Sequence, residues 1–254
     1  MINFLRQHFH PLWRLRKSSL FRAVQDRLDP DFPCSIEGIR ASVKLLRDAS
    51  IILPHEGKEI ESRKAFEKTL KENRIELFFD VGANIGTYSW IAIANRVREV
   101  FLFEPDKTNQ RLLAKTIRSN SLNQCFLIPF AVSDKVGTAR FLVDNASGAT
   151  GSLENHSDNP SSLHHAYGMG VTVTVPTLHL DIFAEYAKSK SVMVKIDVEG
   201  AEVAVFEGAK RFFTQVSPFV LVECFERSRL DYFHEIGYSI HPLPENCNYL
   251  LSPP

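Results

Sequence analysis

Short apolar runs alternate with helix-favouring segments through the middle of the chain. Residues 75–81, 99–104 and 125–132 are dominated by Ile, Val, Leu and Phe, as buried strands are, whereas residues 85–96 and 107–120 favour helices. Near-continuous apolar strands separated by helices are typical of a parallel sheet that is covered on both faces. The pattern therefore predicts an α/β fold built around such a sheet.

The alternation resumes towards the C-terminus. Strands are expected there at residues 192–197, 219–223, 238–241 and 248–251, and helices at 178–188, 201–213 and 230–236. The last two short strands predict an antiparallel hairpin that closes the sheet. Upstream of the first run, residues 51–53 read as a short strand and residues 58–71 as a charged helix.

A long polar segment interrupts this alternation of strands and helices. Residues 144–170 are rich in Ser, Asn, Asp, Gly and His, and they lie between strands expected at 138–143 and 171–175. A loop of this length within a compact domain is usually a functional lid or a disordered segment. We interpret residues 144–170 as a substrate lid loop inside one domain that spans residues 35–254.

The first 34 residues form a separate basic and aromatic arm. Residues 1–30 contain six Arg or Lys and two acids, with Phe, Leu and Trp between them, and Pro11 interrupts any helix. A segment of this kind suits an anionic membrane surface or a lipid-linked acceptor. An arm that packs on its own domain or on a second subunit has the same composition, so peripheral membrane contact and an oligomer both stay open.

The overall charge and the cysteine pattern narrow the class of protein. The chain has 30 Lys and Arg against 30 Asp and Glu, so no nucleic-acid partner is expected. No apolar run approaches the roughly 20 residues that cross a bilayer, and the N-terminus lacks the apolar core of a signal peptide. We therefore predict a cytoplasmic protein. The four cysteines are scattered without a paired zinc spacing, which favours buried structural thiols.

A glycine turn follows the first strong strand. Asp80 ends that strand, and Gly82, Asn84 and Gly86 come before the next helix. Glycines allow a sharp turn and a close approach of the backbone to a ligand at the carboxyl ends of the strands. The Gly-x-Asn-x-Gly spacing differs from the Gly-x-Gly-x-x-Gly that cradles a pyrophosphate. It therefore predicts a nucleoside without a diphosphate, with Asp80 available to accept from the ammonium of an amino-acid moiety.

Polar residues end the next two strands as well. Glu104 closes the strand after the turn, where a carboxylate can accept two hydrogen bonds from a ribose diol. The following strand ends with an apolar wall at residues 130–132, then Ser133 and Asp134. The wall suits one face of an adenine ring, and the two polar residues suit its amino edge. Ser133 and Asp134 equally suit the start of a turn, so both readings stay open.

A second group of charged residues lies on the strand near residue 195 and on the strand that follows it. Lys195 and Asp197 are two residues apart and so point to the same face, while Glu223 ends the neighbouring strand. Two carboxylates and a lysine beside a ligand pocket could bind a metal, orient a substrate hydroxyl or act as a base. Glu199 and Glu202 lie at a helix start, where acids also serve simply as helix caps.

Five segments together resemble the FkbM-type family of methyltransferases over roughly residues 50–250. They are FDVGANIGTYS, FEPD, AVSD, VKIDVEGAEVAVFEGA and LVECFE, in this order. The resemblance implies a Rossmann-like three-layer fold with a mostly parallel seven-stranded sheet. It also implies S-adenosyl-L-methionine as methyl donor and usually O-methylation of small-molecule, sugar, glycolipid or polyketide hydroxyls. By position, it implies a methionine site at Asp80, Gly82, Asn84 and Gly86, a ribose site at Glu104, an adenine site at Ser133 and Asp134, and a transfer site at Asp197 and Glu199.

The base that removes the acceptor proton has several candidates. Asp197 is preferred, with Lys195 or Glu223 orienting the hydroxyl. A lid histidine is the alternative because its ordinary pKa suits proton removal at neutral pH; the candidates are His156, His164 and His165. A divalent cation held by Asp197 and Glu223 also stays open. Two rival functions are an NAD-dependent oxidoreductase, which the Asn84 spacing disfavours, and a non-catalytic nucleoside-binding relative.

Overall fold

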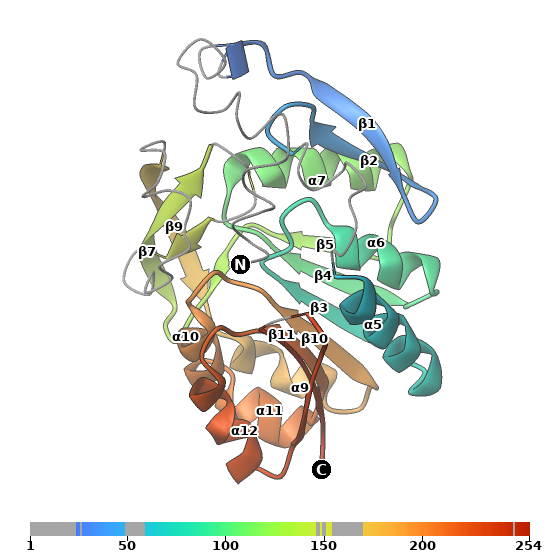
Figure 1. Ribbon diagram of the computed structural model, residues 1–254, viewed down its shortest axis with the longest axis vertical. Coiled ribbons are helices and arrows are strands. Elements are labelled where there is room, and N and C mark those ends of the chain that lie inside the picture. Colours follow the sequence, from blue (N-terminus) through green and yellow to red (C-terminus); the bar gives the residue numbers. More distant parts are fainter. Residues whose placement is uncertain are drawn as a thin grey trace.

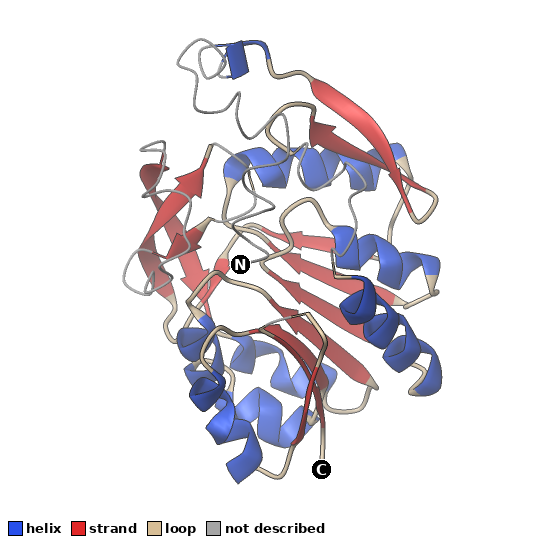
Figure 2. Ribbon diagram, viewed as in Figure 1, coloured by secondary structure: helices blue, strands red, loops and turns tan. Residues whose placement is uncertain are grey.

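The computed structural model describes residues 24–25, 27–48, 59–145, 148, 151–153, 170–245 and 247–254. A central sheet lies between two layers of helices, with a smaller sheet and an N-terminal hairpin beside it (Figures 1 and 2). The strand expected at 51–53, most of the basic arm and most of the lid loop lie outside the described residues. Within the described part of the chain, no helix is both long and apolar enough to span a bilayer.

The central sheet has seven strands in the order β12-β13-β11-β10-β3-β4-β5. The pairs from β11 to β5 are all parallel, whereas β13 is antiparallel to both of its neighbours. This confirms the prediction of a Rossmann-like, mostly parallel seven-stranded sheet with an antiparallel C-terminal hairpin. The strands are β3 (Leu77–Val81), β4 (Glu99–Phe103), β5 (Cys125–Ile128), β10 (Val192–Ile196), β11 (Phe219–Glu223), β12 (Ser239–Pro242) and β13 (Asn248–Ser252).

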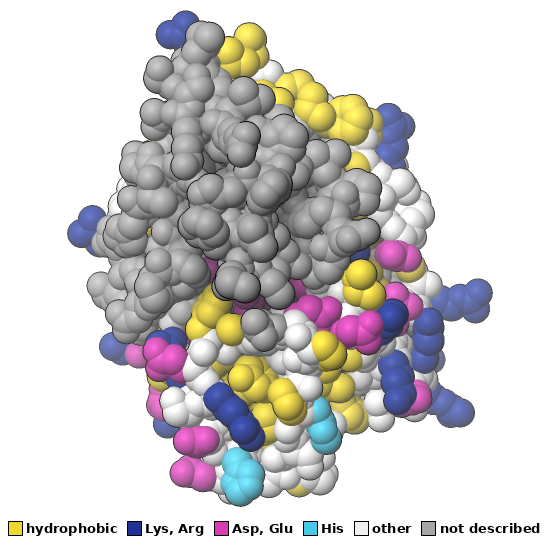
Figure 3. Space-filling view, in the orientation of Figure 1, with side chains coloured by type: hydrophobic (Ala, Val, Ile, Leu, Met, Phe, Trp, Pro, Cys, Tyr) yellow, Lys and Arg dark blue, Asp and Glu magenta, His cyan; other side chains and the backbone are white. Residues whose placement is uncertain are grey.

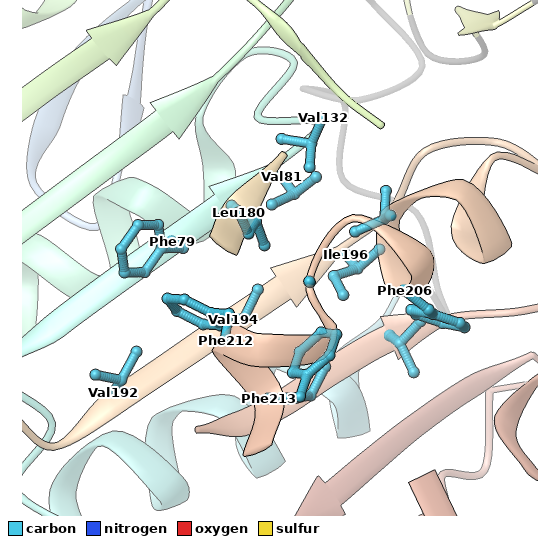
Figure 4. Close-up of a cluster of buried hydrophobic side chains, with 14 of the residues drawn as sticks. Phe79, Val81, Val132, Leu180, Val192, Val194, Ile196, Phe206, Phe212 and Phe213 are labelled. Carbon is cyan, nitrogen blue, oxygen red and sulfur yellow. The ribbon is translucent and has the colours of Figure 1, made fainter. Parts of the chain in front are cut away.

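One layer of helices covers each face of this sheet (Figure 1). One face carries α5 (Ile60–Glu72), α6 (Thr87–Ala94) and α7 (Lys107–Ser119), and the other carries α9 (Ala184–Ala187), α10 (Glu202–Glu207), α11 (Lys210–Val216) and α12 (Asp231–Glu235). Strand residues alternate between the two layers, as the two-residue period of a strand requires. Phe78 packs with Phe66 and Trp90 on the first face, whereas Phe79 packs with Phe212 on the second (Figure 4).

A second sheet of four strands lies beside the first, in the order β6-β9-β7-β8. The antiparallel pair of β7 and β9 confirms the two strands expected on either side of the polar segment. The single strand expected at 125–132 is wrong, because β5 ends at Ile128 and β6 pairs instead with β9. Pro129 cannot donate a hydrogen bond to the central sheet, so the chain leaves it there. The strands are β6 (Ala131–Val132), β7 (Gly137–Asp144), β8 (Ser152–Leu153) and β9 (Gly170–Leu178).

Three expected helices are shorter or divided. The helix expected at 201–213 is two helices, α10 and α11, on either side of Gly208. A Cβ at Gly208 would lie 2.0 Å from the backbone oxygen of Ser133, so the chain passes close to the end of β6 at the break. The helices expected at 178–188 and 230–236 begin as short 3₁₀ turns, at Leu180–Phe183 and Arg227–Leu230, before α9 and α12.

The N-terminal hairpin was not expected from the sequence. It joins β1 (Asp31–Ile36) to β2 (Ile39–Lys44) through Glu37 and Gly38, which both have positive φ, as a two-residue hairpin turn requires. The hairpin packs on α7, where the Ser42 N–H donates to Thr116 Oγ1 over 2.8 Å. The boundary between arm and domain after residue 34 therefore falls inside β1.

Candidate functional site

A pocket, hereafter the main pocket, opens where the carboxyl ends of β3, β4, β6 and β10 meet. The space between its lining residues, open solvent included, is about 670 Å³. Residues from all four strand ends line it, as expected for a ligand site in an open α/β sheet. The lining includes Gly82, Asn84, Glu104, Asp106, Asn109, Phe130, Ala131, Val132, Phe141, Leu153, Asp197, Val198 and Glu199.

The glycines of the β3 turn are required by protein contacts. Gly82 has a φ of +77°, and a Cβ there would lie 2.0 Å from the backbone oxygen of Asp197. Gly86 has a φ of +84°, and a Cβ there would lie 2.5 Å from the indole of Trp90. Of the two, Gly82 lines the main pocket, whereas Gly86 lies at the start of α6 and outside the pocket lining.

Asn84 joins this turn to the next strand. Its backbone is in the left-handed region at a φ of +55°, and its N–H donates to Glu104 Oε2 over 2.7 Å. Its side-chain oxygen is buried at the pocket and has no hydrogen-bond partner among the described residues. A buried acceptor of this kind is costly unless a ligand or water satisfies it. Asn84 therefore offers an acceptor to a ligand's N–H or O–H group.

Glu104 is buried at the end of β4 with both carboxylate oxygens already engaged. Oε2 accepts from Asn84, and Oε1 accepts from the backbone N–H of Asp106 over 2.8 Å. Burial is the main cause that raises its pKa to about 8, although the two backbone hydrogen bonds act in the opposite direction. Each oxygen keeps one further lone pair, so the ionised carboxylate can still accept from a diol.

Asp80 lies deeper than the sequence implied. Its side chain is 1% exposed, and Oδ2 accepts from the Ser89 hydroxyl over 2.6 Å and from the Ser89 N–H over 3.1 Å. The other oxygen has no partner among the described residues. Burial raises the pKa of Asp80, whereas the nearby Lys195 ammonium lowers it. Asp80 lies outside the pocket lining, so any contact with a ligand would pass through a bridging group such as water.

The far end of the main pocket is apolar. Phe130 and the β6 residues Ala131 and Val132 line it, together with Phe141 and Leu153 of the same small sheet. The apolar residues 130–132 therefore line the pocket, and their contact with an adenine ring stays a prediction.

The two polar residues after this wall lie apart from it. Ser133 Oγ donates to Asp134 Oδ1 over 3.1 Å, and Asp134 is exposed. Neither residue belongs to the lining of the main pocket. This arrangement matches the turn reading of Ser133 and Asp134 better than direct contact with a ring.

A smaller side pocket adjoins the main one through Asp197. Asp197 lines both, and the side pocket is completed by Glu59, Tyr88, Lys195, Ile196, Leu221, Glu223 and Asn248. Lys195 Nζ donates to Asp197 Oδ2 over 2.8 Å, and the Tyr88 hydroxyl donates to Glu59 Oε2 over 3.0 Å. The structure thus brings together the three residues Lys195, Asp197 and Glu223 that the sequence singled out.

The electrostatics of the side pocket are set by several carboxylates around one lysine. Burial acts to lower the pKa of Lys195, but Asp197, Asp80 and Glu59 together raise it well above its ordinary value. Burial is the largest cause that raises the pKa of Glu223 well above its ordinary value, and Asp197 and Glu59 add to it. Lys195 is therefore held as an ammonium, and the protonated form of Glu223 is favoured more than in a free glutamate.

The two glutamates after Asp197 have different surroundings. Glu199 lines the main pocket and has a φ of +51°, a conformation that is uncommon for residues other than glycine and asparagine. Glu202 is 1% exposed, accepts from the Gly200 N–H over 2.7 Å and forms an ion pair with Arg229 at 3.3 Å. Glu202 therefore holds the turn before α10, although α10 has no side-chain capping hydrogen bond.

Two further candidates from the sequence are a metal site and the lid histidines. No group of three or more His, Cys, Asp or Glu side chains in the described ranges has the geometry to hold a metal ion. The lid histidines His156, His164 and His165 lie outside the described residues.

Several residues at the two pockets were not singled out from the sequence. Asp106 caps α7 by accepting from the N–H groups of Thr108 and Asn109, a role that the Asp-Lys-Thr-Asn sequence could have indicated. Glu59 reaches the side pocket from the position just before α5, Tyr88 from α6 and Asn248 from β13. No local sequence pattern marks these three, because only tertiary packing brings them together.

The sequence model of the FkbM methyltransferase domain matches residues 80–251 of the chain. A comparison with curated proteins found no match. Among solved structures, an FkbM methyltransferase from Methylobacillus flagellatus KT is 18% identical at a TM-score of 0.48. The match covers 70% of this chain and 43% of that one, so the chain spans less than half of that protein.

Two further structures are similar over most of their length. A putative caffeoyl-CoA O-methyltransferase from Staphylococcus aureus is 14% identical, with a TM-score of 0.45 and coverage of 93% of this chain and 98% of that one. The M. jannaschii TYW2 structure, in complex with AdoMet, is 13% identical, with a TM-score of 0.44 and coverage of 88% and 84%.

Proposed function

The chain belongs to the FkbM family of methyltransferases, and from this premise we propose that it transfers a methyl group from S-adenosyl-L-methionine to a hydroxyl oxygen of a small acceptor. The acceptor class proposed is a sugar, a glycolipid or a polyketide-type molecule. The donor supplies an electrophilic methyl group when it is bound, and the residues of this chain supply binding, orientation and proton removal.

The main pocket has the groups that such a donor requires. The unpartnered Asn84 side-chain oxygen suits an ammonium, and the Glu104 carboxylate suits a ribose diol. The apolar wall formed by Phe130, Ala131 and Val132 suits a nucleobase ring. Gly82 shapes the turn at the pocket edge. In this proposal Asp80 acts through Ser89 and Lys195 rather than by direct contact, and Gly86 supports the turn. Ser133 and Asp134 form the turn that follows the apolar wall, outside the pocket lining.

Asp197 carries the proposal because it lines both pockets at once. An acceptor oxygen in the side pocket and a methyl group in the main pocket would both be next to it. Asp197 is a carboxylate held in place by Lys195, so it can accept the hydroxyl proton while the oxygen attacks. The Glu223 carboxyl group would orient the hydroxyl, and Lys195 would stabilise the charge on Asp197.

A methyl-transfer screen tests this reaction class. Purified protein is incubated with methyl-labelled donor and with extracts enriched in glycans, lipids or polyketides. We expect label in a product that survives mild base, as a methyl ether does. Label found only on nitrogen or carbon would contradict the proposed O-methylation.

A divalent cation bound by Asp197 and Glu223 is the alternative way to activate the hydroxyl. The Lys195 ammonium already occupies the position beside Asp197, which favours a reaction that uses the lysine instead. Prior dialysis against EDTA should therefore leave turnover unchanged. Loss of turnover that added Mg²⁺ restores would favour the metal.

We also propose that the basic arm contacts an anionic membrane surface. Asp29 must be kept in any test, since its carboxylate accepts from the backbone N–H groups of Leu46 and Arg47. Deletion of residues 1–23 should abolish co-sedimentation with phosphatidylserine vesicles and leave donor binding intact. Undiminished co-sedimentation would refute membrane contact through the arm.

A further inference from the structure

The side pocket differs from the main pocket in its charge. Its polar lining consists of Glu59, Tyr88, Lys195, Asp197, Glu223 and Asn248. We propose that the side pocket is the acceptor subsite and that it selects by charge, admitting a hydroxyl flanked by uncharged or cationic groups and rejecting one flanked by phosphate or carboxylate. This inference rests on the proposed methyl transfer, because it names the acceptor class for the same site.

Lys195 is the only cation among the described residues that line the side pocket, and it is already engaged. Lys195 Nζ is bound to Asp197 over 2.8 Å, and its side chain is only 10% exposed. In the sheet register Lys195 also lies directly beside Asp80, whose second carboxylate oxygen has no partner among the described residues. An anionic ligand would have to displace a buried carboxylate to reach this ammonium. Lys195 is therefore poorly placed to attract an anion.

The remaining polar groups also disfavour an anion. The Tyr88 hydroxyl donates to Glu59, so that pair presents carboxylate oxygens rather than a free donor. Tyr88 is 6% exposed and packs edge-on against Phe66 at 5.1 Å, which holds its hydroxyl at Glu59. Acidic side chains gather near the middle of the face shown in Figure 3, among the described side chains there. A negative potential of this kind repels anions and favours cations.

The protonation of Glu223 is consistent with that potential. Its pKa is raised well above the ordinary value by burial and by the carboxylates of Asp197 and Glu59. No described residue donates a hydrogen bond to its side chain. A neutral carboxyl group can both donate to and accept from a hydroxyl, whereas it offers a phosphate only a single donor. Glu223 and Asn248 therefore offer polar contacts to a hydroxyl group of the acceptor.

The charge selectivity can be measured without knowing the acceptor. A thiol is introduced by Asn248→Cys in a background carrying Cys34→Ser and Cys247→Ser, which removes the two half-buried native thiols. The thiol is then modified by two methanethiosulfonates of similar size, a cationic ethyltrimethylammonium and an anionic ethylsulfonate. In each case the thiolate displaces sulfinate and forms a mixed disulfide. A matched thiol from Val136→Cys, at an exposed site 67% accessible, provides the reference.

We expect the ratio of cationic to anionic rates to be at least about tenfold higher at position 248 than at position 136. Adding Glu59→Gln should reduce that excess, because it removes one carboxylate and keeps the side-chain size. The proposal would be overturned by a rate ratio at position 248 that is equal to or lower than the ratio at position 136. A ratio that Glu59→Gln leaves unchanged, or no reaction with either reagent at position 248, would overturn it as well.

The methyl-transfer screen provides the second readout. Acceptors that become labelled should carry no phosphate or carboxylate beside the methylated oxygen, and a labelled acceptor with such a group would overturn the charge selectivity. Methyl transfer and charge selectivity can be refuted independently of each other. Absence of S-adenosylhomocysteine binding would contradict methyl transfer and leave the thiol rate ratio as measured.

Discussion

Gly82 and Asp197 are in backbone contact across the β3–β10 pair. A Cβ at Gly82 would lie 2.0 Å from the Asp197 backbone oxygen, and the Asp197 N–H donates to Val81 over 3.1 Å. The turn that shapes the main pocket and the carboxylate shared by both pockets are therefore positioned by one another. A change at the turn should be felt at Asp197 even though no side chain connects them.

Gly82→Ala should destabilise the protein more than an alanine at an equally strained but open position. Gly38 is the matched control, because its φ of +81° is close to the +77° of Gly82 and nothing lies within 4 Å of its Cβ position. A left-handed alanine alone costs about 1 kcal/mol, whereas the clash with Asp197 adds to it. Urea unfolding should show that Gly82→Ala lowers the free energy of unfolding by at least about 1 kcal/mol more than Gly38→Ala does. Equal losses would show that the contact is not tight.

Donor affinity should rise with pH up to about 8, because the carboxylate of Glu104 must be ionised to accept from the ribose diol. Burial raises its pKa to about 8, so binding at lower pH requires release of a proton. Below that pKa the affinity should rise by up to about tenfold per pH unit. Calorimetric titration with S-adenosylhomocysteine between pH 6 and 9 measures this rise.

Glu104→Gln provides the control for this pH dependence. This variant should bind S-adenosylhomocysteine more weakly at pH 8, and its affinity should lack the rise with pH that ionisation of Glu104 causes. The raised pKa also means that folding favours the protonated form, so this group's contribution to stability falls as pH rises from about 4.5 to about 8. Glu104→Gln should therefore be relatively more stable than the wild type at pH 8 than at pH 5. A wild-type affinity that stays flat from pH 6 to 8 would contradict the assignment.

Asp197→Asn should lower turnover by about 10²–10⁴-fold, because the amide cannot take up the acceptor proton. The amide oxygen can still accept from Lys195, so S-adenosylhomocysteine affinity should change far less than turnover. Glu207→Gln, on the exposed side of α10, is the control for loss of a carboxylate away from the pockets. Near-full turnover of Asp197→Asn with unchanged donor affinity would rule out Asp197 as the base.

The central sheet could be predicted from the sequence because its strands are buried on both faces. All five residues of β3 and all five of β10 are buried, which produces the continuous apolar runs. The β1–β2 hairpin could not, because no residue of β1 is fully buried and β1 contains Pro33, which argues against a strand anywhere but at an edge. The break after Ile128 could have been inferred from Pro129 by the same reasoning.

The part of the candidate site that is formed by residues at the ends of strands could be predicted from the sequence. Asp197 and Glu223 end neighbouring parallel strands, and they reach the same pocket. The burial of Asp80 behind Ser89 and the pairing of Glu59 with Tyr88 depend on how α5 and α6 pack, which no local pattern encodes. Gly86 was expected at a ligand, but its conformation is required by the indole of Trp90.

The most direct test of the account is donor binding by the purified protein. Equilibrium dialysis at pH 8 compares S-adenosylhomocysteine with NAD, using the wild type and Glu104→Gln. The account predicts saturable binding of S-adenosylhomocysteine, weakened by Glu104→Gln, and no comparable binding of NAD. Saturable binding of NAD, or no binding of S-adenosylhomocysteine at millimolar concentration, would contradict it.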